Sequence, residues 1–183
     1  AHAQFETIHP FLDGNGRIGR LLITFLLCEK GALAKPVLYL SHYFKRHRQT
    51  YYDTLQGVRD RGEWEAWIAF FLTGVADVSR EATETARRII ALRERHRQLI
   101  TDHFGYAAGN AHRMLEHLYR RPIVAVGEAR EVLGTSYPSA NNVVRQLVEH
   151  GILRETTGRR RNRRFAYRDY IALFHESPAD DTD

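Results

Sequence analysis

A glycine-rich loop that runs directly into an apolar helix most constrains how this chain can fold. The loop lies within residues 9–20, and the segment after Arg20 is almost entirely apolar. Gly14 and Gly16 allow positive φ and the close approach of a ligand. The first N–H groups of a helix have no intrahelical acceptor and favour an anion. The sequence therefore predicts an anion-binding turn at the start of a helix over about 16–30.

Four charged or titratable side chains belong to this turn. Arg17 and Arg20 are three residues apart, so their guanidinium groups can form a fork for phosphate oxygens. Asp13 would repel a bare phosphate, which indicates a Mg²⁺ ion between the two. His9 supplies the imidazole that could take a proton from a hydroxyl at neutral pH. Each element alone is more often structural, but their joint occurrence before an apolar helix indicates a phosphate-handling site.

Residues 9–20 resemble the signature of the Fic family, His-x-Phe-x-(Asp/Glu)-Gly-Asn-Gly-Arg-x-x-Arg. The resemblance implies a protein adenylyltransferase, which moves AMP from ATP to a Ser, Thr or Tyr hydroxyl of a target protein and releases pyrophosphate. It implies that His9 is the general base, that Phe11 is a buried support of the loop and that Asp13 holds Mg²⁺. It also implies a set of nucleotide-contacting residues: Gly14, Asn15, Gly16, Arg17, Gly19 and Arg20.

Two adjacent tyrosines, Tyr51 and Tyr52, allow two interpretations. The resemblance to Fic proteins implies that they border the nucleotide. The spacing of Phe44, Tyr51, Leu55 and Val58 equally predicts the core face of an amphipathic helix. Both interpretations stay open at the level of sequence.

The remainder of the first half is predicted to be helical. We expect Ser41 to cap a helix, and we expect that helix to be broken over 57–62. A long helix is predicted over 63–103. The helices and the hairpin flap that usually precede the Fic signature are not found in the sequence. We therefore expect the C-terminal part of a longer protein, one that binds nucleotide weakly by itself.

The second half changes to a pattern that resembles a winged helix-turn-helix domain. Three short helices are predicted, over 110–119, 126–133 and 136–150. Two strands, over 152–155 and 164–167, are predicted on either side of a basic turn.

The basic turn carries seven arginines and one acid between Arg154 and Arg168. Such a run is usually a solvated surface, yet in a winged helix it can equally contact phosphates. Winged helices also serve as protein-interaction and dimerisation modules. The candidate DNA-contacting residues are Arg145, Arg159, Arg160, Arg161 and Arg163.

Composition sets the broad class of protein. The net charge is +5, and no apolar run is long enough to span a membrane. The single cysteine excludes an internal disulfide and fits a cytoplasmic protein. We expect a mainly α fold. A truncated Fic-type helical bundle, with its long connecting helix, occupies 1–104, a small winged helix (α+β) domain occupies 105–175, and an acidic, disordered tail occupies 176–183.

The leading prediction is an AMP-transferring enzyme that uses ATP and Mg²⁺, modifies a target protein and forms a homodimer. The alternative is a DNA-binding regulator whose Fic-like part is an interaction or ligand-sensing scaffold. A third possibility keeps the loop but transfers another phosphate-containing group.

Overall fold

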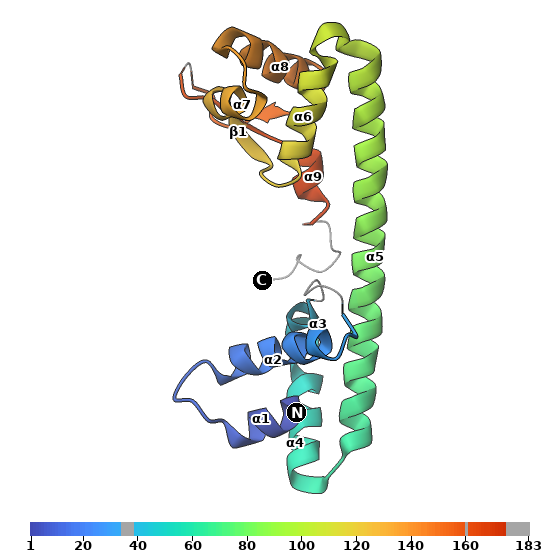
Figure 1. Ribbon diagram of the computed structural model, residues 1–183. Helices are drawn as coiled ribbons and strands as arrows, with labels where there is room; N and C mark the ends of the chain where they lie inside the picture. The colour runs from blue at the N-terminus through green and yellow to red at the C-terminus, as the bar shows by residue number, and fades with distance from the viewer. Residues whose placement is uncertain (34–38, 160, 175–183) are drawn as a thin grey trace. The chain divides into compact units, whose positions relative to one another are not determined.

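The computed structural model describes residues 1–33, 39–159 and 161–174 and confirms the mainly α fold class (Figure 1). The chain divides into two compact units, Ala1–Glu84 and Thr85–Asp183. This division falls inside the long helix rather than at its end. The predicted domain boundary after residue 104 stays a prediction.

The regular elements among the described residues of the first unit are all helices. Its elements are α1 (His2–Ile8), α2 (Asn15–Glu29), α3 (Leu40–Arg46), α4 (Arg48–Arg61) and the first part of α5 (Trp64–His103). The helix predicted over about 16–30 is confirmed as α2, and the long helix predicted over 63–103 is confirmed as α5. Helix α2 ends where Gly31 takes a φ of 71° and donates its N–H to the Cys28 carbonyl.

Two predicted helix boundaries are wrong. Helix α3 begins at Leu40, with Tyr39 in the N-cap position, so Ser41 lies inside the helix and does not cap it. Helix α4 runs through Gly57 and ends at Arg61. A single glycine costs a helix only about 1 kcal/mol, which the surrounding packing can offset. Gly62, with a φ of 69°, is the residue that ends this helix.

Aromatic side chains form the core of the first unit. Helix α3 supplies Phe44, α4 supplies Tyr51 and α5 supplies Trp67, and all three are buried. The rings of Phe44 and Tyr51 stack with centroids 4.8 Å apart. Tyr51 therefore lies in the core, as the core-face interpretation predicts.

His2 fixes α1 against both α2 and α4. Its Nδ1 lies 2.9 Å from the Gly19 carbonyl oxygen and its Nε2 lies 2.9 Å from the Tyr51 hydroxyl. Burial lowers the pKa of His2 to about 4, so the ring is neutral at pH 7. Because a carbonyl can only accept, Nδ1 donates to Gly19 and Nε2 accepts from the Tyr51 hydroxyl.

Gly74 on α5 lies directly against the buried Tyr43 ring. A Cβ at Gly74 would be 2.6 Å from Tyr43 Cδ1. The ring is rigid and 4% exposed, so it cannot move aside easily. We expect Gly74→Ala to lower the free energy of unfolding by about 2 kcal/mol through overpacking.

Gly109 offers a matched control for this substitution. It also lies within a helix, α6 (Ala108–Leu118), but a Cβ there would have no heavy atom within 4 Å. Gly109→Ala should therefore stabilise the chain by about 0.5–1 kcal/mol. Urea unfolding of both variants measures the difference, and equal destabilisation would contradict the packing at Gly74.

The second unit combines short helices with a small antiparallel sheet. After α5 come the 3₁₀ turn Gly105–Ala107, α6 (Ala108–Leu118), β1 (Ile123–Ala125), α7 (Val126–Leu133), α8 (Tyr137–Glu149), β2 (Arg154–Glu155), β3 (Arg164–Ala166) and α9 (Arg168–Ala172). The strand order is β1-β3-β2, with Ala166 opposite both Ile123 and Arg154. The three predicted helices are confirmed to within two residues at each end.

Strand β1, like helix α9, is an element that sequence analysis missed. It has three residues and runs directly into α7, so it is too short to show an alternating pattern. Its pairing with β3 depends on residues about forty positions later in the chain. In the described part of the chain, no helix is long and apolar enough to cross a membrane.

Candidate active site

The loop between α1 and α2 is held by its own side chains. Gly14, at the N-cap of α2, has a φ of 80°, which strains residues with a side chain. Asn15 is 2% exposed; its Oδ1 accepts the Phe11 N–H at 2.9 Å and its Nδ2 donates to the Phe11 carbonyl. The Asn15 amide thus closes the loop on itself and is not free to contact a ligand without breaking these bonds.

The start of α2 presents unused backbone donors. Within the described residues, the N–H groups of Asn15, Gly16 and Arg17 have no acceptor. The next N–H, that of Ile18, donates to the Gly14 carbonyl at 3.0 Å. Free N–H groups at the positive end of a helix dipole are suited to bind an anion.

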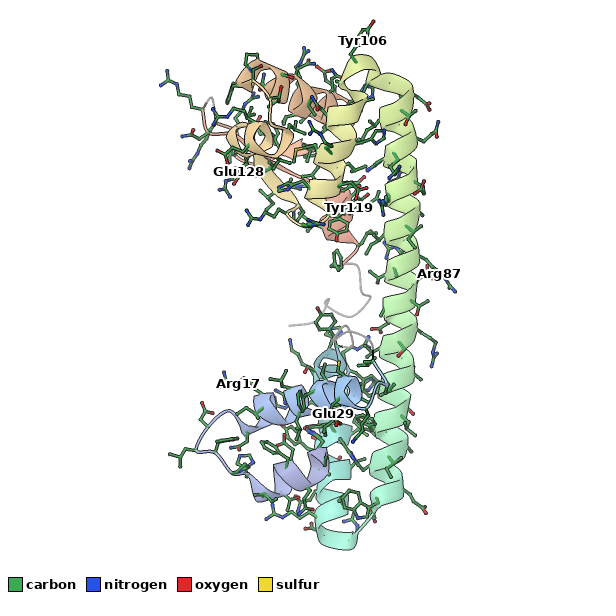
Figure 2. The ribbon with its side chains drawn as sticks, viewed as in Figure 1. Arg17, Glu29, Arg87, Tyr106, Tyr119 and Glu128 are labelled. Atoms are coloured by element: carbon green, nitrogen blue, oxygen red, sulfur yellow. The ribbon has the colours of Figure 1, made fainter. Side chains whose placement is uncertain are left out.

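Both arginines of the signature fold back over this helix start. A Cβ at Gly14 would lie 3.4 Å from Arg17 Nη2, and a Cβ at Gly16 would lie 3.2 Å from Arg20 Nη1. Glycine at these two positions therefore leaves room for the guanidinium groups beside the free N–H groups. Figure 2 labels Arg17 at the start of α2.

Asp13 pairs with Arg17 across the loop, with 3.4 Å between Oδ2 and Nη2. The two side chains are 93% and 77% exposed, so solvent screens the pair and a ligand could replace it at little cost. No cluster of three or more His, Cys, Asp or Glu that could hold a metal occurs among the described residues. A Mg²⁺ ion at Asp13 would therefore need ligands from a bound phosphate.

His9 ends α1 with an unusual backbone conformation. Its φ is 51°, in the left-handed region, and its N–H donates to the Phe5 carbonyl at 2.9 Å. The residue is exposed, and its imidazole makes no hydrogen bond to any described residue. The ring is thus available to a ligand on the same loop that carries Asp13.

Three roles that the resemblance to Fic proteins implies differ from what the structure shows. Phe11 is 49% exposed, so its prediction as a buried support is wrong; its neighbouring ring is Phe5, at 6.3 Å between centroids. Gly19 lies under the side chains of Phe5 and Glu6, where it serves close packing of α1 on α2. Tyr51 lies in the core, whereas Tyr52 is 51% exposed, with Arg48 5.7 Å from its ring centroid.

The predicted DNA-contacting arginines differ in their partners. Arg145, on α8, donates to Asn142 Oδ1 at 2.7 Å. Arg163 lies 3.7 Å from a Glu155 oxygen. Arg159 and Arg161 are exposed and have no ion pair with any described residue. The remaining predicted residue, Arg160, lies outside the described residues.

Two cavities occur away from the loop. One, of about 530 Å³, lies in the second unit between the end of α5 and α8, and its lining includes His103, Arg145 and His150. The other, of about 270 Å³, lies in the first unit and is lined by His2, Ile23, Trp67 and neighbouring residues. Neither includes a residue of the loop over 9–20, whose Asp13 and Arg17 side chains are exposed.

His2 and Glu6 contact the loop helix but were not singled out in the sequence. Both lie on α1, which precedes the loop, and both meet Gly19. The signal that could have revealed them is Gly19 itself, because a glycine inside an apolar helix often marks the close approach of another element.

The free N–H groups, the two arginines and the adjacent imidazole form a candidate anion-binding loop with a candidate proton acceptor. The model of the Fic/DOC family matches residues 1–27, which contain this loop. The N-terminal segment of the chain is thus similar to proteins of the Fic/DOC family.

Named relatives match part of the chain. The chain is similar to "Protein adenylyltransferase Fic" of Aedes aegypti, with 43% identity over 70 residues, which cover 38% of this chain and 13% of that relative. A relative of the same name from Culex quinquefasciatus gives the same values. A probable protein adenylyltransferase of Aquifex aeolicus is 59% identical over 32 residues, which cover 18% of this chain and 10% of that relative. The matches therefore span about an eighth or less of the relatives' length.

Proposed function

We propose that the loop site transfers AMP from ATP to a hydroxyl group of a target protein. The observation that carries this proposal is the set of three free N–H groups with the Arg17 and Arg20 guanidinium groups folded over the glycines beside them. This arrangement suits the phosphate groups of a nucleotide. The names of the relatives, all protein adenylyltransferases, support the choice of AMP as the transferred group.

In the proposed reaction the target hydroxyl oxygen attacks the α-phosphorus of ATP. The new oxygen–phosphorus bond forms as the bond from the α-phosphorus to the β-phosphate oxygen breaks, and pyrophosphate leaves. The hydroxyl proton passes to a ring nitrogen of His9, which the structure leaves free. Most of the catalysis is then positioning and neutralisation of charge.

The Asp13 carboxylate fits a Mg²⁺ site that is completed by substrate. Mg²⁺ is commonly bound by one or two carboxylates together with substrate phosphates, and it keeps several waters. Asp13 is exposed on the same loop as the free N–H groups. When bound, the ion would neutralise phosphate charge, while Arg17 would exchange its contact with Asp13 for a phosphate oxygen.

Labelled ATP tests the proposal. The natural chain that carries these residues is incubated with Mg²⁺ and ATP labelled at the α- or the γ-phosphate, and modified proteins are identified by mass spectrometry. AMP transfer predicts protein labelling from the α-label only. Labelling from the γ-label would show transfer of a different phosphate-containing group and would refute the proposal. A homodimer stays a prediction of the family resemblance, and a cytoplasmic location stays a prediction from the single cysteine.

A second candidate function, DNA binding, is proposed for the second unit as a winged helix. The observation that favours it is the pair of exposed arginines without ion-pair partners, Arg159 and Arg161, on the segment between β2 and β3. Helix α8, which begins at Tyr137 after its Ser136 cap, would enter the groove. The alternatives for this unit are protein recruitment and dimerisation.

Salt dependence tests this second function. If Arg159 and Arg161 each contact a phosphate, replacing both with alanine should weaken binding to duplex DNA and reduce the slope of log K against log salt by about 2. Arg61→Ala with Arg80→Ala removes the same charge from two exposed, ion-paired sites in the first unit and serves as control. An equal effect of both pairs would mean that only net charge matters.

A further inference from the structure

The cavity of about 530 Å³ in the second unit has the size of a small-molecule site, for which about 300–1,000 Å³ is usual. It lies between α8 and the end of α5 with the 3₁₀ turn that follows, and is called here the α5–α8 cavity. Aromatic and polar side chains dominate its lining, which includes His103, Tyr106, Asn142, Arg145, Glu149 and His150.

Helix α8 turns one polar stripe toward this cavity. The stripe consists of residues spaced three or four positions apart, as one face of a helix requires: Asn142, Arg145, Gln146 and Glu149. The buried residues of α8 occupy other positions: Ala140, Val143, Val144 and Leu147. The core of the second unit therefore does not use the polar stripe.

Two histidine rings form an aromatic side of the cavity. The ring centroids of His103 and His150 are 5.3 Å apart, and the ring planes are within 21° of parallel. The buried Phe104 ring lies 5.1 Å from the His150 ring and supports it. Neither imidazole makes a hydrogen bond to any described residue. Such rings suit a planar ligand, because aromatic groups prefer to stack with an offset.

Arg145 brings positive charge to the same cavity. Its Nη2 donates to Asn142 Oδ1 at 2.7 Å, and its Nη1 lies 3.8 Å from Glu149 Oε1. The side chains of Arg145 and Glu149 are 63% and 55% exposed, so solvent screens this ion pair and it contributes little. Arg145 can therefore exchange Glu149 for a phosphate or carboxylate, which a guanidinium group binds through two parallel hydrogen bonds.

We propose that the α5–α8 cavity binds a small aromatic anion, a planar ring that carries a phosphate or carboxylate group. The ring packs against the imidazoles of His103 and His150, and the anionic group pairs with Arg145. Phosphate and carboxylate share the paired oxygen acceptors that a guanidinium group recognises, so both belong to the ligand class. This site goes beyond the proposed AMP transfer and DNA binding and depends on neither.

NMR titration of the 183-residue chain with phenyl phosphate and with benzoate tests the site. The imidazole C–H signals of His103 and His150 should shift at millimolar concentrations of at least one probe, because its ring lies against theirs. Inorganic phosphate lacks the ring and phenol lacks the charge, so each should need about tenfold higher concentration. Tighter binding of phenyl phosphate assigns the ligand to organic phosphates, and tighter binding of benzoate assigns it to carboxylates. The His9 signal reports separately on binding at the loop.

Three variants separate the cavity from general charge effects. Arg145→Ala should weaken binding about tenfold or more, because a hydrogen-bonded charge is lost. Arg130→Ala, on α7 of the same unit, removes an exposed arginine that pairs with Glu131 at 3.7 Å and should leave binding unchanged. Glu149→Gln should tighten binding about two- to fivefold, because the carboxylate that competes for Arg145 is gone.

The outcomes are distinct. If neither aryl anion shifts the His103 and His150 signals, the proposal is wrong, and equal losses in Arg145→Ala and Arg130→Ala would also overturn it. A response of these histidines to duplex DNA but to neither aryl anion would make the polar stripe of α8 a nucleic-acid surface and refute a small-molecule site. If Arg145→Ala does not fold, Glu149→Gln decides, since unchanged affinity there would contradict the role of Arg145.

Discussion

Replacing His9 with alanine is expected to lower the rate of AMP transfer by about two to four orders of magnitude, the usual contribution of a general base. His9 is exposed on the loop and makes no side-chain hydrogen bond to any described residue, so its removal leaves the packing unchanged. The expected loss is therefore chemical. Initial rates of α-label incorporation at saturating Mg²⁺-ATP measure it in the natural chain.

His42→Ala is the matched control for this experiment. His42, on α3, is partly exposed, and its side chain makes no hydrogen bond, ion pair or ring contact with any described residue. It should transfer AMP at the wild-type rate. Equal rates for His9→Ala and the wild type would remove His9 from the mechanism, whereas a parallel loss in both variants would indicate a general defect.

Removing both arginines of the signature is expected to abolish measurable nucleotide binding. A hydrogen bond to a charged group contributes about 1.5–3 kcal/mol, so each guanidinium group accounts for about a 10- to 150-fold change in affinity. Arg17→Ala combined with Arg20→Ala removes both groups that lie over Gly14 and Gly16. Calorimetric titration with Mg²⁺-ATP, performed on wild type and variant, measures the change in Kd.

Arg80→Ala is the control for loss of positive charge. Its side chain is 76% exposed on α5 and pairs with Asp77 at 2.8 Å, three positions earlier in the same helix. Nucleotide affinity should be unchanged in this variant. If the double variant binds Mg²⁺-ATP as tightly as the wild type, the anion site does not lie at the start of α2.

The local part of the site could be predicted from sequence because it depends on neighbouring residues. The turn of Gly14, the free N–H groups after it and the spacing of Arg17 and Arg20 follow from one helix start. Helices α7 and α8 could be predicted for the same reason, since their caps and apolar spacing are contained within each segment. The buried role expected of Phe11 failed because burial depends on what other elements cover a ring.

The sequence by itself determined the glycine-rich turn at the start of α2, the placement of its two arginines and the mainly helical class, because these depend on residues within a few positions of one another. Only the tertiary structure decided that His2 reaches Gly19, seventeen positions away, and Tyr51, forty-nine positions away. The same holds for the seat of Glu6 on Gly19 and for the pairing of β1 with β3. Such contacts join separate elements, and helical periodicity shows which face of an element is buried but not which partner meets it.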